Sequence, residues 1–160
     1  MATPEVLRRE VKALAFDQYG TVVAVVAEIE VYPREGRIWA RKFTVAHDCG
    51  LIINPKSLRQ TIEGNVVQGL SRTLFEEVRF DRNTVTSVDW ASYPILTFPE
   101  IPEIVIELID RPTMPPWGAG EPSAAVVPSA ISNAVFDAIG VRLRTVPFTP
   151  DKVKAAPRAA

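Results

Sequence analysis

The chain has 160 residues, of which 47% are hydrophobic and 23% are charged, and its 18 Lys and Arg side chains nearly balance 19 Asp and Glu. This composition is typical of one globular domain. The near-neutral charge argues against the basic face that a nucleic-acid partner requires, so we expect no nucleic acid. The longest apolar stretch, Val22 to Ala27, is too short to span a bilayer, so we expect no membrane span. The lone Cys49 excludes an internal disulfide.

The start of the chain is mixed in character and weakly patterned. Met1 to Lys12 carries several charges and no apolar core, which is unlike a signal peptide. We therefore predict an irregular lead over residues 1–21. We also predict a cytoplasmic location, or a periplasmic one if the chain is exported with a signal-bearing partner.

The next segment predicts a β-hairpin. Apolar side chains alternate with polar ones from Val23 to Val31, and again from Arg37 to Ala46, which is the period of half-buried strands. Pro33 to Gly36 between them has turn chemistry. We expect two sets of residues to share a face within their strands: Val25, Ala27, Ile29 and Val31, and then Trp39, Phe43 and Val45.

A long amphipathic helix is predicted over residues 55–74. Asn54 has the right chemistry for its N-cap, and Pro55 suits the first helical position. Gly64 and Gly69 are costly inside a helix, at about 1 kcal/mol each relative to Ala, which indicates close packing or the close approach of another group. One stripe recurs near every fourth residue and should be buried: Leu58, Ile62, Val66, Leu70 and Leu74.

The rest of the chain predicts further short elements and an α+β fold with a mixed or antiparallel sheet. A second hairpin is expected from strands at 77–80 and 84–89, followed by a strand at 104–109. The second main helix is expected over 123–139, with Pro128 kinking it or marking its start and Gly140 ending it. A final strand is expected at 141–146, then a short helix capped by Thr149, and a tail over 155–160.

Two polar clusters are candidates for chemistry. His47 is the only histidine and precedes Asp48 and Cys49, but one His and one Cys cannot complete a metal site. A small-ligand hydrolase that uses His47 with Asp48 stays open as a minor alternative, and it requires a closed pocket around His47. The more common interpretation is a histidine at a strand end with local hydrogen bonds.

The second cluster is the loop Trp117-Gly118-Ala119-Gly120-Glu121. Its glycines let the backbone pass close to a bulky planar ligand or adopt positive φ. Glu121 precedes a helix, where backbone N–H groups favour an ionised carboxylate, as a general base needs. The alternative is an acid that merely starts a helix. Trp117 is a candidate for lining an aromatic substrate funnel, or else packs on the proline-rich loop.

Four segments in order resemble the molybdopterin-binding large subunit of the xanthine dehydrogenase/aldehyde oxidase family. They are HDCGLIINP at 47–55, IEGNVVQGLSRTLFEEV at 62–78, WASYPILTFPEIPEI at 90–104 and GAGEPSAAVVPSAISNAVFDAIGVRLR at 118–144. The resemblance covers roughly residues 22–154. It implies the C-terminal molybdopterin-binding domain of a hydroxylase for aldehydes or N-heteroaromatic, purine-like substrates, with water as the oxygen source.

The resemblance also implies a site. Glu121 falls on the family's catalytic glutamate, and Gly118, Gly120, Gly64 and Gln68 fall beside the cofactor. Thr61 stands where many relatives have a cofactor-contacting glutamine, so that contact is weakened here. No residue of this chain is expected to bind the metal directly. The implied cofactor is molybdenum-molybdopterin, in a cytosine or guanine dinucleotide form, with iron–sulfur clusters, FAD or haem on partner subunits only.

The family's cofactor-binding subunit is several times longer than this chain, so we expect an incomplete part that is inactive alone. Its expected partners are the remaining portion of that subunit, an iron–sulfur subunit, and an FAD or cytochrome subunit. The alternative is a non-catalytic assembly module derived from the family. A large exposed apolar patch beside Glu121 would favour the incomplete enzyme, and a polar surface there the module.

Overall fold

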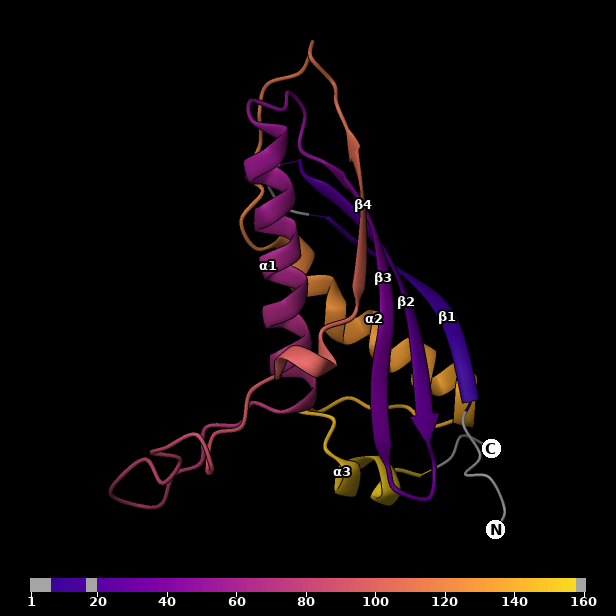
Figure 1. Cartoon of the computed structure of the whole chain (residues 1–160), viewed down its shortest axis with the longest axis vertical. Coiled ribbons are helices and arrows are strands. Elements are labelled where there is room, and N and C mark those ends of the chain that lie inside the picture. Colours follow the sequence, from indigo (N-terminus) through magenta and orange to yellow (C-terminus); the bar gives the residue numbers. More distant parts are fainter. Residues whose placement is uncertain (1–6, 17–19, 158–160) are drawn as a thin grey trace.

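A computed structural model describes residues 7–16 and 20–157, and these form a sheet with helices on one face (Figure 1). The strand order is β1-β2-β3-β4, with bounds Leu7–Phe16, Val22–Tyr32, Arg37–Asp48 and Glu103–Ile109. Strands β1 and β2 pair in antiparallel orientation, and so do β2 and β3. Strand β4 pairs with β3 in parallel. This parallel pair needs a crossover, which contains helix α1 (Pro55–Leu74). The predicted α+β class with a mixed sheet is confirmed.

Strand β1 corrects the prediction of an irregular lead over residues 1–21. Leu7 to Phe16 pairs with β2 along its whole length, from Leu7↔Val31 to Phe16↔Val22. The strand lies at the edge of the described sheet, where charged residues are common and a clean hydrophobic alternation is not required. Residues 1–6 and 17–19 of the predicted lead lie outside the described part of the chain.

The predicted hairpin is confirmed as β2 and β3, but one of its faces was assigned wrongly. Glu28 pairs with Lys42 and Ile29 pairs with Ala40, so Arg41 is an extra residue in β3. Such a bulge reverses the alternation of side chains. Trp39 therefore lies on the face opposite Phe43, where the guanidinium carbons of Arg37 and Arg41 lie 4.2 and 4.8 Å from its ring centroid.

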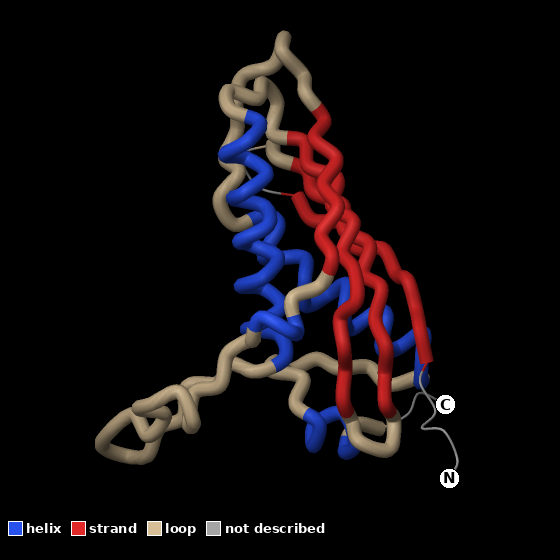
Figure 2. The backbone as a smooth tube through the Cα atoms, viewed as in Figure 1, coloured by secondary structure: helices blue, strands red, loops and turns tan. Residues whose placement is uncertain are grey.

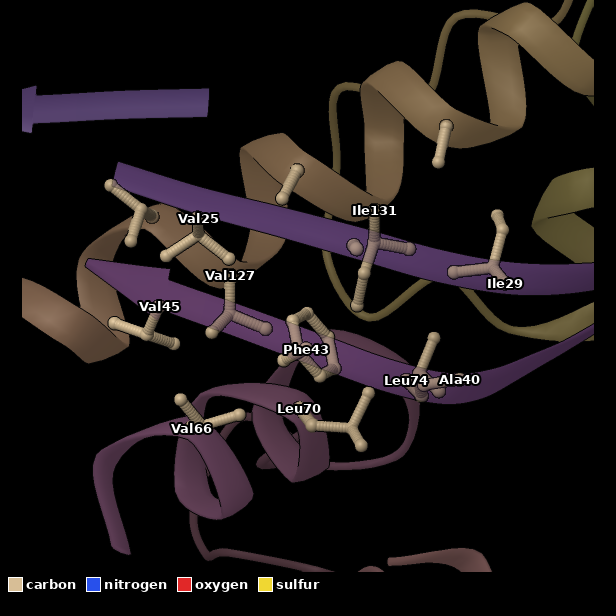
Figure 3. Close-up of a cluster of buried hydrophobic side chains, with 14 of the residues drawn as sticks. Val25, Ile29, Ala40, Phe43, Val45, Val66, Leu70, Leu74, Val127 and Ile131 are labelled. Carbon is tan, nitrogen blue, oxygen red and sulfur yellow. The ribbon is translucent and has the colours of Figure 1, made fainter. Parts of the chain in front are cut away.

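The hydrophobic core lies between the inner face of this sheet and the two main helices (Figure 3). Helix α2 (Pro122–Ile139) packs on β1, β2 and α1, and the five apolar residues of the predicted α1 stripe are buried. Phe43 lies within this cluster, with Leu70 of α1 and Val127 of α2 nearby, and is fully buried. Burying an aromatic ring of this size is a large contribution to the stability of a small domain.

The capped start of α1 and the glycine end of α2 follow the predicted chemistry. The Asn54 side chain accepts a 3.0 Å hydrogen bond from the Ser57 N–H, so it caps α1 as expected. Gly140 ends α2 in the left-handed conformation, with φ of 68°. Pro128 lies inside α2 and does not mark its start. Thr149 precedes helix α3 (Pro150–Ala155), but its hydroxyl makes no capping hydrogen bond.

Two predicted strand regions are not strands in the structure. Residues 77–89 contain only an isolated bridge between Phe80 and Val85, because this hairpin has no sheet to join. Residues 141–146 run beside α2, where the Ser132 hydroxyl donates a 2.7 Å hydrogen bond to the Leu143 carbonyl oxygen. Their apolar side chains Val141 and Leu143 are buried and belong to the hydrophobic core.

Residues 76–102, which we call the arm, leave the end of α1 and return to β4 by way of a short 3-10 helix, η1 (Phe98–Glu100). Figure 2 shows most of this segment as a loop that extends away from the sheet and helices before the chain returns through η1. Across the described ranges, no helix is both long enough and apolar enough to cross a membrane.

Candidate functional site

The segment that follows β4 is tied to the end of β3 by backbone and side-chain contacts. The Arg111 N–H donates to the Gly50 carbonyl oxygen at 3.1 Å, and the Trp117 N–H donates to the Cys49 carbonyl oxygen at 2.8 Å. Asp48 accepts a 3.0 Å hydrogen bond from the Gly50 N–H and forms an ion pair with Arg111 at 2.9 Å. Asp48 therefore fastens the loop before Glu121 to the body of the protein.

Trp117 packs against the backbone of this junction. A Cβ at Gly20 would lie 3.1 Å from the Trp117 ring, and one at Gly50 would lie 3.2 Å from it. The guanidinium carbon of Arg111 lies 5.2 Å from the ring centroid, and the indole is only half-buried. These contacts give Trp117 a packing role on the loop. Its role in a substrate funnel stays a prediction.

The Gly118–Glu121 loop is held from both sides. The Thr21 hydroxyl, which is buried, donates a 2.5 Å hydrogen bond to the Gly118 carbonyl oxygen. The side-chain amide of Asn65 on α1 donates to the Gly120 carbonyl oxygen. The loop is therefore pinned between the start of β2 and the middle of α1, although its own residues are small.

Glu121 is exposed at the start of α2. Its backbone carbonyl oxygen accepts from the Ala124 and Ala125 N–H groups at 2.9 and 3.1 Å, but its carboxylate makes no capping hydrogen bond. Pro122 at the next position has no N–H to attract that carboxylate. The side chain is thus fixed at its base and turned to the outside of the described protein.

The helix opposite this loop presents an open face. Thr61, Gly64, Asn65 and Gln68 share one side of α1 by helical periodicity, and Thr61, Gly64 and Gln68 are exposed. Because Asn65 holds Gly120, this side of α1 and the Gly118–Glu121 loop border the same region. The predicted site residues Thr61, Gly64, Gln68, Gly118, Gly120 and Glu121 are therefore brought together.

The glycines of this region separate into two kinds. A Cβ at Gly64, Gly118 or Gly120 would meet no atom within 4 Å, and none of the three has positive φ. A Cβ at Gly69, in contrast, would lie 3.0 Å from the Ala124 carbonyl oxygen and 3.1 Å from the Val127 side chain. Gly69 is explained by the packing of α1 on α2, whereas Gly64, Gly118 and Gly120 leave backbone accessible to a flat group from outside.

Two predicted cofactor neighbours differ in what they can still offer. The Thr61 hydroxyl donates a 3.0 Å hydrogen bond to the Ser57 carbonyl oxygen of its own helix. Its proton is therefore committed, and only lone pairs remain for a ligand. Gln68 is exposed, and no hydrogen bond of its side chain is found within the described part of the chain. Its amide keeps both donor and acceptor groups available.

His47 does not form part of this site. It is fully buried on the inner face of β3, and neither ring nitrogen has a hydrogen-bond partner among the described residues. Burial lowers the pKa of the imidazole, and the negative charge of Asp48 opposes this effect in part. A histidine closed off in this way cannot reach a ligand, so the hydrolase alternative has no support from the structure. Its expected local hydrogen bonds are absent as well.

Sequence reasoning missed Asn65 and Thr21, which pin the loop. Asn65 could have been found, because it lies between Thr61 and Gln68 on the same side of the predicted helix. Thr21 carried no local signal, since its partner Gly118 is 97 residues away along the chain.

The matching family model is described as a molybdopterin cofactor-binding domain, and it covers residues 7–102. The match begins with β1, which was assigned to the lead region by the sequence analysis.

Two similar proteins are named as subunits of a dehydrogenase and of an oxidoreductase. A nicotinate dehydrogenase subunit of Pseudomonas putida is 42% identical over 142 residues, which cover 88% of this chain and 12% of that protein. The aldehyde oxidoreductase molybdenum-binding subunit PaoC of Escherichia coli is 31% identical over 143 residues, covering 85% of this chain and 20% of that protein. The chain therefore spans about an eighth of the length of the first relative and a fifth of the length of the second.

Solved structures show the same fold. The aldehyde oxidoreductase from Desulfovibrio desulfuricans superposes with a TM-score of 0.73 at 26% identity, covering 86% of this chain and 16% of that one. Quinoline 2-oxidoreductase from Pseudomonas putida 86 superposes with a TM-score of 0.72, also at 26% identity, covering 86% of this chain and 19% of that one.

Proposed function

Because this chain belongs to the molybdopterin cofactor-binding domain family of xanthine dehydrogenase/aldehyde oxidase-type proteins, we propose that it contributes the general base Glu121 to a molybdenum hydroxylase. The substrate class we propose is aldehydes or N-heteroaromatic rings, with water as the source of oxygen. The observation that carries this proposal is the exposed Glu121 carboxylate, held on a loop pinned to α1 and free of any capping bond.

The open face of α1 and the glycine loop fit a large planar cofactor. Gly64, Gly118 and Gly120 have no atom where a side chain would stand, so the backbone can approach a flat ring system closely. The Gln68 amide, and the lone pairs of Thr61, would supply hydrogen bonds to the edges of the pterin. When bound, molybdenum-molybdopterin supplies the two-electron oxidation, and its dinucleotide form is left open by these residues.

In this proposal Glu121 is the residue of the chain that accepts a proton during the reaction. An exposed carboxylate at a pinned position accepts a proton from an oxygen nucleophile that reaches hydrogen-bond distance. Its placement is maintained by Asn65 and Thr21, which fix the carbonyl oxygens of Gly120 and Gly118. Asn65 and Thr21 act as positioning residues, because they touch the loop and not the reacting atoms.

The test is Glu121→Gln in the assembled enzyme, produced together with the remaining subunit portion and the electron-transfer subunits. We expect kcat to fall by about 10²–10⁴-fold, the usual contribution of a placed base. Glu107→Gln is the matched control, because Glu107 is an exposed carboxylate on β4, away from the loop. A Glu121→Gln enzyme that keeps the wild-type kcat removes the assignment.

We further propose that the chain by itself neither retains molybdenum nor turns over substrate. The open face of α1 borders a cofactor on one side only, and the chain spans 12% and 20% of two relatives whose names state a dehydrogenase and a molybdenum-binding subunit. Its one cysteine, Cys49, cannot supply the several ligands of an iron–sulfur cluster, so electrons would leave through iron–sulfur and FAD or haem groups on partner subunits. Stoichiometric molybdenum in the purified chain contradicts this proposal.

A further inference from the structure

The arm carries most of the large hydrophobic residues that are exposed in the described structure. Eight of the twelve large hydrophobic residues that are exposed in the described structure lie on it. They are Val78, Phe80, Val85, Val88, Trp90, Ile95, Phe98 and Ile101, and Phe80, Val88, Trp90 and Phe98 each have at least 75% of their surface exposed. A monomeric protein rarely leaves so much apolar surface together in water, which indicates an interaction site.

Polar contacts fix the two ends of the arm to the rest of the described protein, which we call the body. The Ser71 hydroxyl of α1 accepts a 3.0 Å hydrogen bond from the Leu96 N–H. The Tyr93 hydroxyl donates to a Glu76 carboxylate oxygen at 2.8 Å, which raises the pKa of Tyr93. The arm therefore leaves the body in a defined direction.

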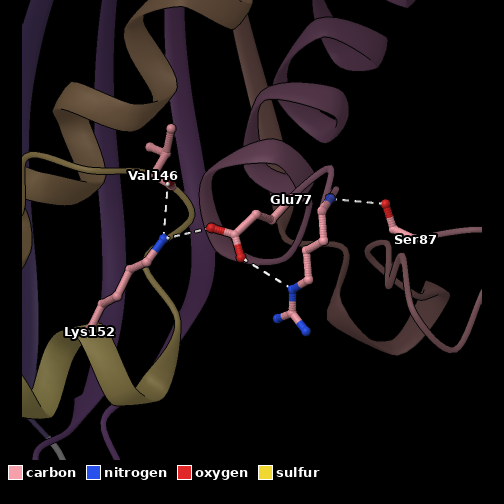
Figure 4. Close-up of polar contacts among 5 residues, drawn as sticks. Glu77, Ser87, Val146 and Lys152 are labelled. Carbon is pink, nitrogen blue, oxygen red and sulfur yellow. Dashed lines mark hydrogen bonds and ion pairs between the residues drawn. The ribbon is translucent and has the colours of Figure 1, made fainter. Parts of the chain in front are cut away.

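A second set of contacts surrounds Glu77 (Figure 4). The Lys152 ammonium lies 3.1 Å from one Glu77 oxygen, and the Arg79 Nε lies 3.4 Å from the other. The hydrogen bond from Lys152 is the main cause that lowers the pKa of Glu77. The arm is thus connected to α3 as well as to α1.

The outer part of the arm is also shaped by its own hydrogen bonds. Asp81 accepts from the Asn83 and Thr84 N–H groups at 2.7 and 2.9 Å. The Ser87 hydroxyl accepts from the Arg79 N–H at 3.0 Å, as Figure 4 shows. Polar groups of the arm thus have partners within it, whereas the rings of Phe80, Trp90 and Phe98 are exposed. A preorganised apolar surface costs less entropy to bind than one that must first fold.

We propose that the arm is the docking surface by which this chain joins the remaining portion of the molybdenum-binding subunit, with Phe80 and Trp90 as its anchors. This inference rests on the proposed function, because it takes the occupant from the enzyme to which the chain contributes Glu121. The relatives explain the choice of occupant, since 88% and 80% of the length of two of them lies outside the region that this chain covers.

A second copy of this chain is the less suitable occupant. The hollows around Arg142 on the body are lined in part by Arg142, Arg144 and Asn133. An apolar anchor placed there would take water away from the charged guanidinium groups of Arg142 and Arg144, which costs free energy. Helix α1 ends at Leu74, nine residues beyond the Asn65 contact with the Glu121 loop, and the arm begins after that end, so docking through the arm leaves the open face accessible.

The test uses the tagged nicotinate dehydrogenase relative from Pseudomonas putida, from which the matching 142-residue segment has been deleted, co-expressed with this chain. We expect the wild-type chain to be retained on the tagged polypeptide. The double variant Phe80→Ser/Trp90→Ser should lose at least about tenfold in retention, as is usual for buried aromatic anchors. Ile53→Ser is the matched control, because Ile53 is 75% exposed like Trp90 but precedes α1 at its other end.

Circular dichroism and thermal unfolding of the purified variants establish that they fold like the wild type. A photoreactive p-benzoylphenylalanine at position 90 then identifies the occupant, and we expect a cross-link to the tagged polypeptide. The inference is overturned by full retention of the double variant, by equal loss with Ile53→Ser, by no retention of the wild-type chain, or by cross-links between copies of this chain.

The outcome for Glu121 is independent of these results. Glu121→Gln is expected to assemble like the wild type and to lose turnover only. If it assembles and stays active while the arm variants fail to assemble, the proposed base is wrong and the docking surface stands. If the arm variants assemble normally and Glu121→Gln is inactive, the docking surface alone is wrong.

Discussion

Helix α1 ends where two very different parts of the molecule meet. On one side of this junction Leu70 and Leu74 are buried against the sheet, with 0% and 7% of their surface exposed. On the other side, Phe80 and Trp90 of the arm are 76% and 75% exposed. Side chains of the same chemical kind therefore serve two purposes, because only those in the body have a surface of this chain to cover them. The body accounts for the stability of the fold, and the arm is available for contact with another polypeptide.

The largest effect is expected at the centre of the body. Phe43→Ala removes a fully buried ring from between the sheet and the two helices and leaves a cavity, so the free energy of unfolding should fall by about 3–5 kcal/mol. Urea denaturation of the isolated chain measures this. A loss below about 1 kcal/mol would mean that the sheet–helix core is not what stabilises the body.

Gly69 and Gly64 provide a sharper contrast within α1 itself. Gly69→Val places a side chain against the Ala124 carbonyl oxygen and Val127, so we expect a loss of about 1–3 kcal/mol in the free energy of unfolding. Gly64→Ala enters open space and should stabilise the isolated chain by about 0.5–1 kcal/mol through helix propensity. The same Gly64→Ala change should weaken molybdenum retention by the assembled enzyme. Equal effects of the two changes on the free energy of unfolding would contradict the difference between the packed Gly69 and the open Gly64.

The buried His47 makes the stability of the body depend on pH. Because its pKa is lower in the folded chain than the ordinary value near 6.5, the unfolded chain takes up a proton first as the pH falls. Stability from this group is complete above about pH 6.5 and is lost below it, by at most about 1.4 kcal/mol per pH unit. Urea denaturation at pH 7.5 and pH 5.5 measures the difference. His47→Leu should reduce the dependence, and an unchanged dependence in that variant would assign it to other groups.

The smallest effect on folding is expected in the arm. Phe80→Ser and Trp90→Ser remove exposed side chains, so each should change the free energy of unfolding of the isolated chain by less than about 0.5 kcal/mol. Thermal and urea unfolding of both variants provide the measurement. A loss of several kcal/mol would show that the arm stabilises the body after all.

Local chemistry made much of the fold predictable. The Asn54 cap, the α1 stripe and the Gly140 terminus depend on residues within a few positions of each other, and all are as predicted. Trp39 was placed on the wrong face because the bulge at Arg41 depends on the pairing with β2. The strand β1 was missed for the same kind of reason, since its partner and not its own pattern makes it a strand.

In the candidate site too, some features could be predicted from local sequence and others depend on distant partners. Glu121, its glycines and the helix residues Thr61, Gly64 and Gln68 could be named because the segments that contain them resemble those of a known family, and such segments are local stretches of sequence. The sequence by itself therefore determined the two main helices and the β2–β3 hairpin, and it named the residues that carry the proposed chemistry. Only the tertiary structure decided that Gly69 packs inside while Gly64 stays open, that His47 is enclosed, and that Thr21 and Asn65 hold the loop. The physical reason is that burial and long-range hydrogen bonds depend on which distant segments the folded chain brings into contact.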